Sequence, residues 1–119
     1  MLNELPSIVA EYIRAVNSFN TDAIIATFAK DALVNDNHRE IAGTAAVRRW
    51  LDKEIVGDHV TMQVRDVRDH YGETIMNCLY DGDYDKINLP KGLILTNYLR
   101  VHDGKIVSLF YIHNKPSPF

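Results

Sequence analysis

The sequence contains a single cysteine, Cys78, among its 119 residues. One thiol has no partner for an internal disulfide, and it leaves a zinc site without a second sulfur ligand. A disulfide scaffold and a cysteine-ligated zinc domain are therefore excluded. The cysteine content fits a reducing compartment.

Long apolar runs and clustered positive charge are also missing. No apolar stretch approaches the roughly 20 residues that a membrane span requires. Glu4 and Pro6 stand where a signal peptide needs a basic start and an apolar run, so we expect the protein in the cytoplasm. The 13 Lys and Arg residues against 16 acidic ones give a formal net charge of -3, with Arg48 and Arg49 as the only adjacent pair. Nucleic acid and membranes are therefore not expected as partners.

The composition is that of one globular domain. Apolar residues make up 46% of the chain and charged residues 24%, which is the balance of a folded, soluble protein. The chain is long enough to close one hydrophobic core and too short for two. No repeat, linker or low-complexity tract interrupts it. We expect a single domain over residues 1–119.

Three helices are predicted in the first half of the chain. Apolar residues recur at three- and four-residue spacing over 5–19, which is typical of a helix that buries one stripe. A short second helix is predicted from Ala23 to Phe28, ending near Lys30, after capping oxygens at 20–22. A third is predicted over 45–55. Its inner face carries Val47, Trp50, Leu51 and Ile55.

The second half has the alternating pattern of strands. Residues 32–38 begin as a short strand that runs into a loop, and turn residues then separate strands near 59–69, 73–81, 93–102 and 105–113. Asp103-Gly104 is a two-residue hairpin signal, because both positions tolerate positive φ. Three helices followed by hairpin-linked strands predict an α+β fold, a curved sheet with helices on one face.

Three polar residues stand where apolar ones are expected or where the chain turns. Asn97 interrupts an apolar strand face, so it either bonds a neighbouring backbone group or donates into a pocket. Tyr12 lies on the buried stripe of the first helix, where most tyrosines are core residues. Asp36 ends the first strand among Asn35, Asn37 and His38, which is the composition of an ordinary turn. Each residue thus has a structural and a functional interpretation.

Five segments together resemble the ketosteroid isomerase branch of the nuclear transport factor 2-like (SnoaL-like) superfamily. They are residues 11–16 (EYIRAV), 22–29 (DAIIATFA), 32–36 (ALVND), 43–50 (GTAAVRRW) and 97–106 (NYLRVHDGKI). The resemblance implies a cone-shaped fold, also called cystatin-like. In this fold a curved antiparallel or mixed sheet carries three N-terminal helices on its concave side.

The resemblance also implies catalytic roles. In the family, a tyrosine of the first helix and an aspartate of the first strand face each other across a pocket, and Tyr12 and Asp36 match these positions. Asp36 would then be the general base and Tyr12 an oxyanion donor. Asn97 stands where the isomerases carry a protonated aspartic acid. An amide is a weaker acid than a carboxylic acid, and losing a good oxyanion donor costs about 3 to 4 kcal/mol. Slow catalysis or a substrate other than a steroid is expected.

The remaining pocket is expected to be apolar and to take an apolar small molecule without a cofactor. Its candidate lining comprises Phe28, Trp50, Met62, Leu93, Leu95 and Leu99, with His38 at the mouth. The function that the resemblance implies is proton transfer α to a carbonyl, as in an isomerase or polyketide cyclase. The alternative is a non-catalytic small-molecule-binding or dimeric interaction protein of the same superfamily. Epoxide-opening members need an Asp-Arg-Asp arrangement, for which the sequence offers no clear counterpart.

Two further predictions concern partners and metals. Strand 105–113 is apolar on both faces, so both faces need cover. One face is expected to meet the core and the other a second subunit, giving a homodimer through the outer sheet face, as the family also suggests. The alternating Asp81, Asp83 and Asp85 lack the glycine and closing glutamate of a calcium loop. No metal site is expected.

Overall fold

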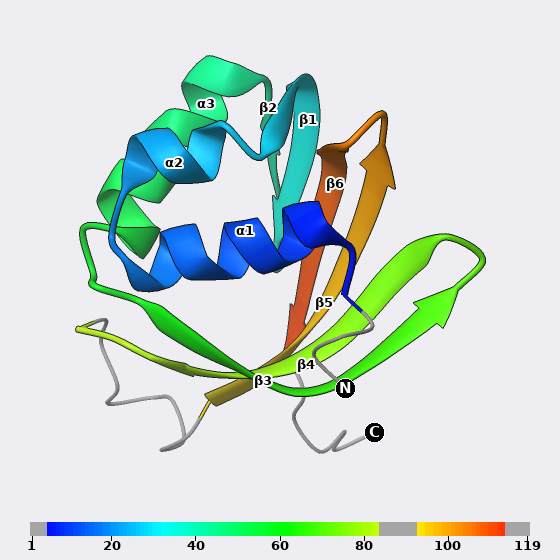
Figure 1. Ribbon diagram of the computed structural model, residues 1–119. Helices are drawn as coiled ribbons and strands as arrows, with labels where there is room; N and C mark the ends of the chain where they lie inside the picture. The colour runs from blue at the N-terminus through cyan, green and yellow to red at the C-terminus, as the bar shows by residue number, and fades with distance from the viewer. Residues whose placement is uncertain (1–4, 84–92, 114–119) are drawn as a thin grey trace.

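The computed structural model describes residues 5–83 and 93–113. Within these ranges, three helices lie on the concave side of a curved, six-stranded sheet (Figure 1). In chain order the elements are α1 (Ser7–Asn17), α2 (Thr21–Ile25), β1 (Phe28–Asp36), β2 (Arg39–Ala42), α3 (Thr44–Trp50), a π-helical turn (Leu51–Ile55), β3 (Thr61–His70), β4 (Glu73–Asp81), β5 (Leu93–His102) and β6 (Lys105–His113).

The strand order is β2-β1-β6-β5-β4-β3. β1 and β6 run parallel, and every other neighbouring pair is antiparallel. This arrangement confirms the predicted α+β class with a curved mixed sheet and three N-terminal helices on the concave side. Among the described helices, none has the length and apolar content that crossing a bilayer needs.

The first strand begins earlier than the sequence predicted. The second helix ends at Ile25, and β1 starts at Phe28, where the chain pairs with Ile106 of β6. The predicted end of this helix near Lys30 is therefore wrong. Local propensity favoured a helix through Ala26 and Phe28, but parallel pairing with a strand far along the chain overrides such a preference.

The segment predicted as a loop after Asp36 is instead a tight hairpin into β2. Asp36 pairs with Arg39, and the two residues between them, Asn37 and His38, have φ of 52° and 76°. Two successive positive φ values give the turn that matches the twist of the flanking strands. The backbone N–H of His38 donates to the Asn35 side chain at 2.8 Å, which supports the turn.

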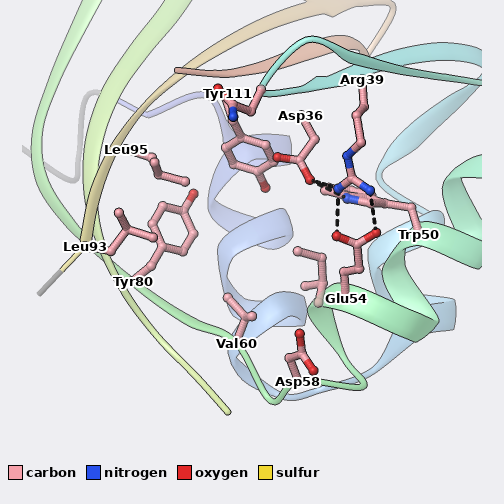
Figure 2. A pocket seen from close by; sticks show the side chains of 12 residues that line it. Asp36, Arg39, Trp50, Glu54, Asp58, Val60, Tyr80, Leu93, Leu95 and Tyr111 are labelled. Carbon is pink, nitrogen blue, oxygen red and sulfur yellow. Dashed lines mark hydrogen bonds and ion pairs between the residues drawn. The ribbon is translucent and has the colours of Figure 1, made fainter. Parts of the chain in front are cut away.

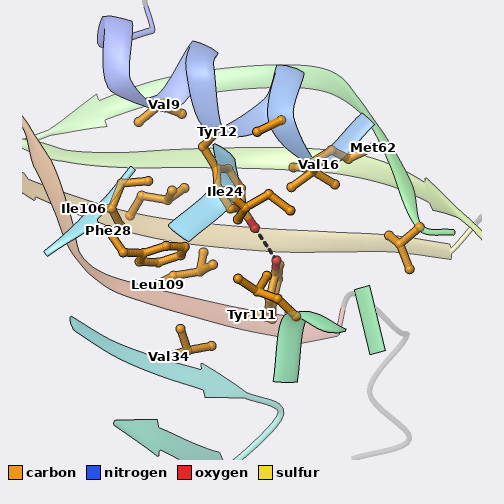
Figure 3. Packing of buried hydrophobic residues seen from close by; sticks show 14 of the residues in the cluster. Val9, Tyr12, Val16, Ile24, Phe28, Val34, Met62, Ile106, Leu109 and Tyr111 are labelled. Atoms are coloured by element: carbon orange, nitrogen blue, oxygen red, sulfur yellow. Dashed lines mark hydrogen bonds between the residues drawn. The ribbon is translucent and has the colours of Figure 1, made fainter. Parts of the chain in front are cut away.

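The core lies between α1 and the inner face of the sheet (Figure 3). On β4 the buried side chains alternate, and Met76, Cys78 and Tyr80 point to the same side as the helices. Cys78 is a free thiol whose pKa burial raises to about 12, so it stays protonated. From α1, Tyr12 packs against Phe28 with the ring centroids 5.8 Å apart, edge to face. This packing positions the Tyr12 hydroxyl, which contacts the hydroxyl of Tyr111 on the concave side.

Candidate functional site

A cavity of about 350 Å³ opens on the concave side, between the sheet and the segment that follows α3 (Figure 2). It combines aromatic and aliphatic walls with a charged rim. Its lining residues are Asp36, Asn37, Arg39, Trp50, Glu54, Ile55, Asp58, Val60, Tyr80, Leu93, Leu95 and Tyr111.

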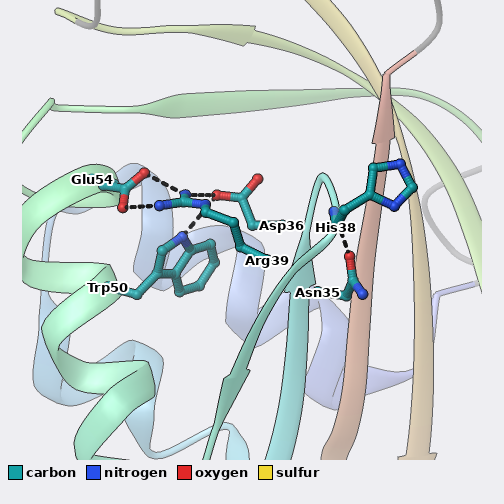
Figure 4. A network of polar contacts seen from close by, with 6 residues as sticks. All are labelled: Asn35, Asp36, His38, Arg39, Trp50 and Glu54. Atoms are coloured by element: carbon teal, nitrogen blue, oxygen red, sulfur yellow. Dashed lines mark hydrogen bonds and ion pairs between the residues drawn. The ribbon is translucent and has the colours of Figure 1, made fainter.

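Asp36 is held through one of its two carboxylate oxygens. Its Oδ2 accepts the indole N–H of Trp50 at 3.0 Å and a guanidinium N–H of Arg39 at 2.5 Å (Figure 4). Its Oδ1 has no hydrogen bond to any residue within 5–83 and 93–113. The side chain is 23% exposed, so water reaches only part of it. One oxygen is therefore fixed in place while the other is free to accept a proton.

Arg39 joins two carboxylates at the rim of the cavity. Its guanidinium donates to Asp36 and, in a two-bond fork at 2.9 and 2.6 Å, to Glu54. The hydrogen bonds with Glu54 are the largest cause that raises the pKa of Arg39 above its ordinary value, so the group stays charged. The Arg39 side chain is 55% exposed, so the pairs add little to stability, but the fork sets the position of each partner.

Trp50 is the last residue of α3, and the π-helical turn that follows it brings Glu54 to the same rim. The backbone N–H of Val56 donates to Leu51 five residues back at 2.7 Å, and such turns often occur at functional sites. Gly57 ends the turn where no side chain fits, because a Cβ there would lie 2.5 Å from the carbonyl oxygens of Asp52 and Lys53.

Tyr12 reaches the cavity only through another tyrosine. Its hydroxyl lies 2.7 Å from that of Tyr111, and Tyr12 is fully buried (Figure 3). The Tyr12 hydroxyl has no other hydrogen-bond partner among the described residues. A buried hydroxyl left without an acceptor costs about 1–3 kcal/mol, so Tyr12 donates to Tyr111. The Tyr111 hydroxyl is also hydrogen-bonded with that of Tyr80, and both tyrosines line the cavity, so the Tyr111 proton can point to Tyr80 or to a ligand.

Asn97 does not line the cavity and contacts a residue that does. Tyr80, which lines the cavity, donates its hydroxyl to the Asn97 carbonyl oxygen at 2.7 Å. The amide nitrogen of Asn97 donates to the backbone carbonyl of Leu95 at 3.3 Å, and Asn97 is fully buried. Both ends of the amide are thus bonded within the protein.

Burial raises the pKa of all three tyrosines above the ordinary tyrosine value, and it is the largest cause for each of Tyr12, Tyr80 and Tyr111. At neutral pH they are uncharged donors.

These shifts predict a loss of stability in alkali. An unfolded tyrosine loses its proton near pH 10, roughly, whereas Tyr12, Tyr80 and Tyr111 in the folded protein keep theirs. Above that pH the folded state binds more protons than the unfolded state, so stability is full below it and falls as pH rises. The slope should approach about 4 kcal/mol per pH unit for the three groups. Urea unfolding at rising pH measures it, and a free energy of unfolding that is flat above this pH would contradict it.

The other sequence-predicted site residues divide into two groups. Trp50 and Leu95 line the cavity, as does Leu93. Phe28, Met62 and Leu99 are buried in the core and are not among the lining residues; nor is His38, which lies exposed in the β1–β2 turn.

Arg39, Glu54, Asp58 and Tyr80 line the cavity but were not predicted. For Tyr80, strand parity with Met76 and Cys78 was an available signal. For Glu54 it was the four-residue spacing from Trp50 along one helix face. Of the alternating aspartates that were weighed as a calcium loop, Asp85 lies outside the described residues.

Comparison with known proteins finds similarity in structure. No protein-family model and no curated protein sequence matches the chain. A protein assigned as a polyketide cyclase from Sinorhizobium meliloti superposes with a TM-score of 0.83 at 25% identity, covering 94% of this chain and 99% of that one.

Two further structures show the same fold. A protein of ketosteroid isomerase-like fold from Catenulispora acidiphila, solved with trimethylamine, has a TM-score of 0.78 at 18% identity over 92% of this chain and 86% of that one. An epoxide hydrolase/cyclase-like enzyme of pyran ring formation in the polyether salinomycin has 0.75 at 21% identity, over 91% and 88%. Together with the helix-lined curved sheet, these likenesses place the chain in the nuclear transport factor 2-like (SnoaL-like) superfamily.

Proposed function

We propose that the protein binds an apolar carbonyl compound in this cavity and transfers a proton at the carbon next to the carbonyl, as an isomerase or cyclase does. The observation that carries the proposal is the hydrogen bonding of the Asp36 carboxylate. Its Oδ2 is fixed by Trp50 and Arg39, and its Oδ1, at the cavity wall, has no hydrogen bond from the described part of the chain. A general base needs such a fixed carboxylate with one oxygen open to the substrate.

The reaction needs two groups at the substrate. The α C–H bond breaks, its proton passes to Asp36 Oδ1, and its electron pair moves through the carbonyl to leave an enolate oxygen. In this proposal Tyr111 supplies the matching donor, because it accepts the Tyr12 proton and can turn its own proton from Tyr80 to that oxygen. Asp36 then returns the proton to a carbon of the enolate. Electrostatic stabilisation of this kind is strongest where water is excluded.

In this proposal Tyr12 and Asn97 are positioning residues. Tyr12 orients Tyr111, and Asn97 holds the hydroxyl of Tyr80. The role of oxyanion donor, which the resemblance implied for Tyr12 and Asn97, passes to the tyrosine that touches the cavity. Of the expected apolar lining, Trp50, Leu93 and Leu95 line the cavity.

Exchange of α protons for deuterium tests the proposal. Small cyclic ketones are incubated in deuterated buffer with and without the protein, and the loss of the α-proton signal is followed by NMR. We expect faster exchange with the protein than with buffer alone at the same pH. Binding without any acceleration of exchange would support the non-catalytic alternative instead.

A second candidate reaction is epoxide opening. Asp36, Arg39 and Glu54 form a carboxylate–guanidinium–carboxylate set, which has the character of the Asp-Arg-Asp arrangement of epoxide-opening members. The salinomycin enzyme named above shares the fold. Incubation of small epoxides in water enriched in heavy oxygen tests this reaction: a labelled diol that forms faster with the protein than in buffer alone supports it, and equal rates contradict it.

We further propose that two copies associate through the outer face of the sheet. There Ile75, Tyr98 and Phe110 are register partners on adjacent strands, and each is partly exposed in the single chain. A Phe110→Asp variant should run as a monomer in light scattering, with wild type as a dimer, because a carboxylate is costly to bury. Tyr71→Asp, at an exposed turn, is the control and should stay dimeric. A monomeric wild type would overturn the proposal.

A further inference from the structure

The rim of the cavity carries more negative than positive charge. Among the described lining residues, the acidic side chains are Asp36, Glu54 and Asp58, and the basic one is Arg39. Arg39 is already bonded to both Asp36 and Glu54, so its charge is neutralised within the protein. The Asp58 carboxylate has no such cation among the described residues. The described lining residues therefore carry two more acidic than basic side chains, which disfavours an anionic ligand.

The backbone of Asp58 is held by a hydrogen bond from Asp83. Its backbone carbonyl accepts the N–H of Asp83 at 2.6 Å. The Asp83 side chain is in turn bonded to His59 at 2.8 Å. Within the described part of the chain, no Lys or Arg other than Arg39 is among the lining residues.

Aromatic rings line the same space. The rings of Trp50 and Tyr111 have centroids 5.9 Å apart and are tilted by 47°. The rings of Tyr80 and Tyr111 are 6.0 Å apart at 81°. The three rings are therefore inclined to one another and form an angled aromatic wall. The negative face of an aromatic ring attracts a cation, and such walls recognise alkylated ammonium groups.

We propose that the ligand of this cavity carries an alkylated ammonium group together with its carbonyl. The ammonium end lies toward Asp58 and Glu54 against the aromatic wall, and the apolar body contacts Leu93 and Leu95. This inference rests on the proposed function, because it names the substrate class of the same site. The negative charge of the rim would then select the substrate at the binding step.

Matched cyclic ketones test the inference. The 1,1-dimethyl-4-oxopiperidinium ion and 4,4-dimethylcyclohexanone have the same shape and the same α protons, and they differ by a charged nitrogen in place of a carbon. 4-Oxocyclohexanecarboxylate supplies the opposite charge. By isothermal titration calorimetry we expect the ammonium ketone to bind at least about tenfold more tightly than the neutral one, and the anion most weakly. Equal or tighter binding of the neutral ketone would overturn the inference.

A pair of variants locates the effect. Asp58→Asn should lower the ratio of the two affinities by roughly threefold or more, because it removes a rim carboxylate that no Lys or Arg of the described residues neutralises. Asp69→Asn removes the same charge from an exposed position on β3, outside the lining residues, and should leave the ratio unchanged. If both variants lower the ratio equally, the preference reflects the net charge of the protein and the inference fails.

The deuterium readout separates this inference from the proposed function. Tighter binding of the ammonium ketone without exchange of its α protons keeps the substrate class and refutes the proton transfer. Exchange on both ketones with equal affinity keeps the proton transfer and refutes the substrate class.

Discussion

The Asp36→Asn variant should exchange the α protons of a bound ketone about 100-fold to 10,000-fold more slowly than the wild-type protein, because an amide oxygen is too weak a base to take the proton. The substitution is nearly isosteric. The amide oxygen can still accept from Trp50 Nε1 and Arg39, which now bond to Oδ2. The fold and the cavity should therefore survive, and the loss should lie in the exchange rate and not in ligand affinity.

The control for this variant is Asp69→Asn, which makes the same change on the exposed face of β3. It should exchange at the wild-type rate. Melting temperatures of all three proteins show whether any loss reflects unfolding. Wild-type exchange in the Asp36→Asn protein would mean that another group is the base.

The Tyr111→Phe substitution should have the second large effect on the exchange rate. The variant loses the hydroxyl that faces the cavity, and removal of one oxyanion donor lowers the rate by about 100-fold to 1,000-fold. It also leaves the Tyr12 hydroxyl, buried and bonded only to Tyr111 among the described residues, without an acceptor. We therefore expect a fall in stability of about 1–3 kcal/mol as well.

Two companion variants separate these effects. Tyr12→Phe keeps the Tyr111 donor and should slow exchange much less than Tyr111→Phe. The double variant removes both hydroxyls and should recover part of the stability that Tyr111→Phe loses, because no buried hydroxyl is left without a partner. Its exchange rate should remain as low as that of Tyr111→Phe. Faster exchange in Tyr111→Phe than in Tyr12→Phe would contradict the proposed order of the two tyrosines.

Much of the fold was predictable because its patterns are local. The stripe on α1 and the alternation along β4, β5 and β6 follow from the spacing of apolar residues. The start of β1 at Phe28 was not predictable in this way, because its partner Ile106 lies far along the chain. The hairpin at Asn37 also escaped, since a short exposed strand such as β2 has no apolar alternation.

The candidate site was predictable in part for the same reason. Strand parity and the helical stripe indicated that Tyr12 and Asn97 face inward, and both are fully buried. What stands between them and the cavity depends on packing, and the rings of Tyr111 and Tyr80 occupy that space. Pairing of Arg39 with Glu54 likewise depends on the approach of the β1–β2 hairpin to the π-helical turn, which no local pattern encodes.

A crystal structure with a small phenol bound tests the central claim most directly, because a planar phenol resembles the enolate that Asp36 would form. We predict that the phenol oxygen lies within hydrogen-bonding distance of the Tyr111 hydroxyl, and that the ring edge beside this oxygen faces Asp36 Oδ1. A phenol whose oxygen instead bonds Arg39 at the rim, or whose ring lies outside the cavity, would contradict the account.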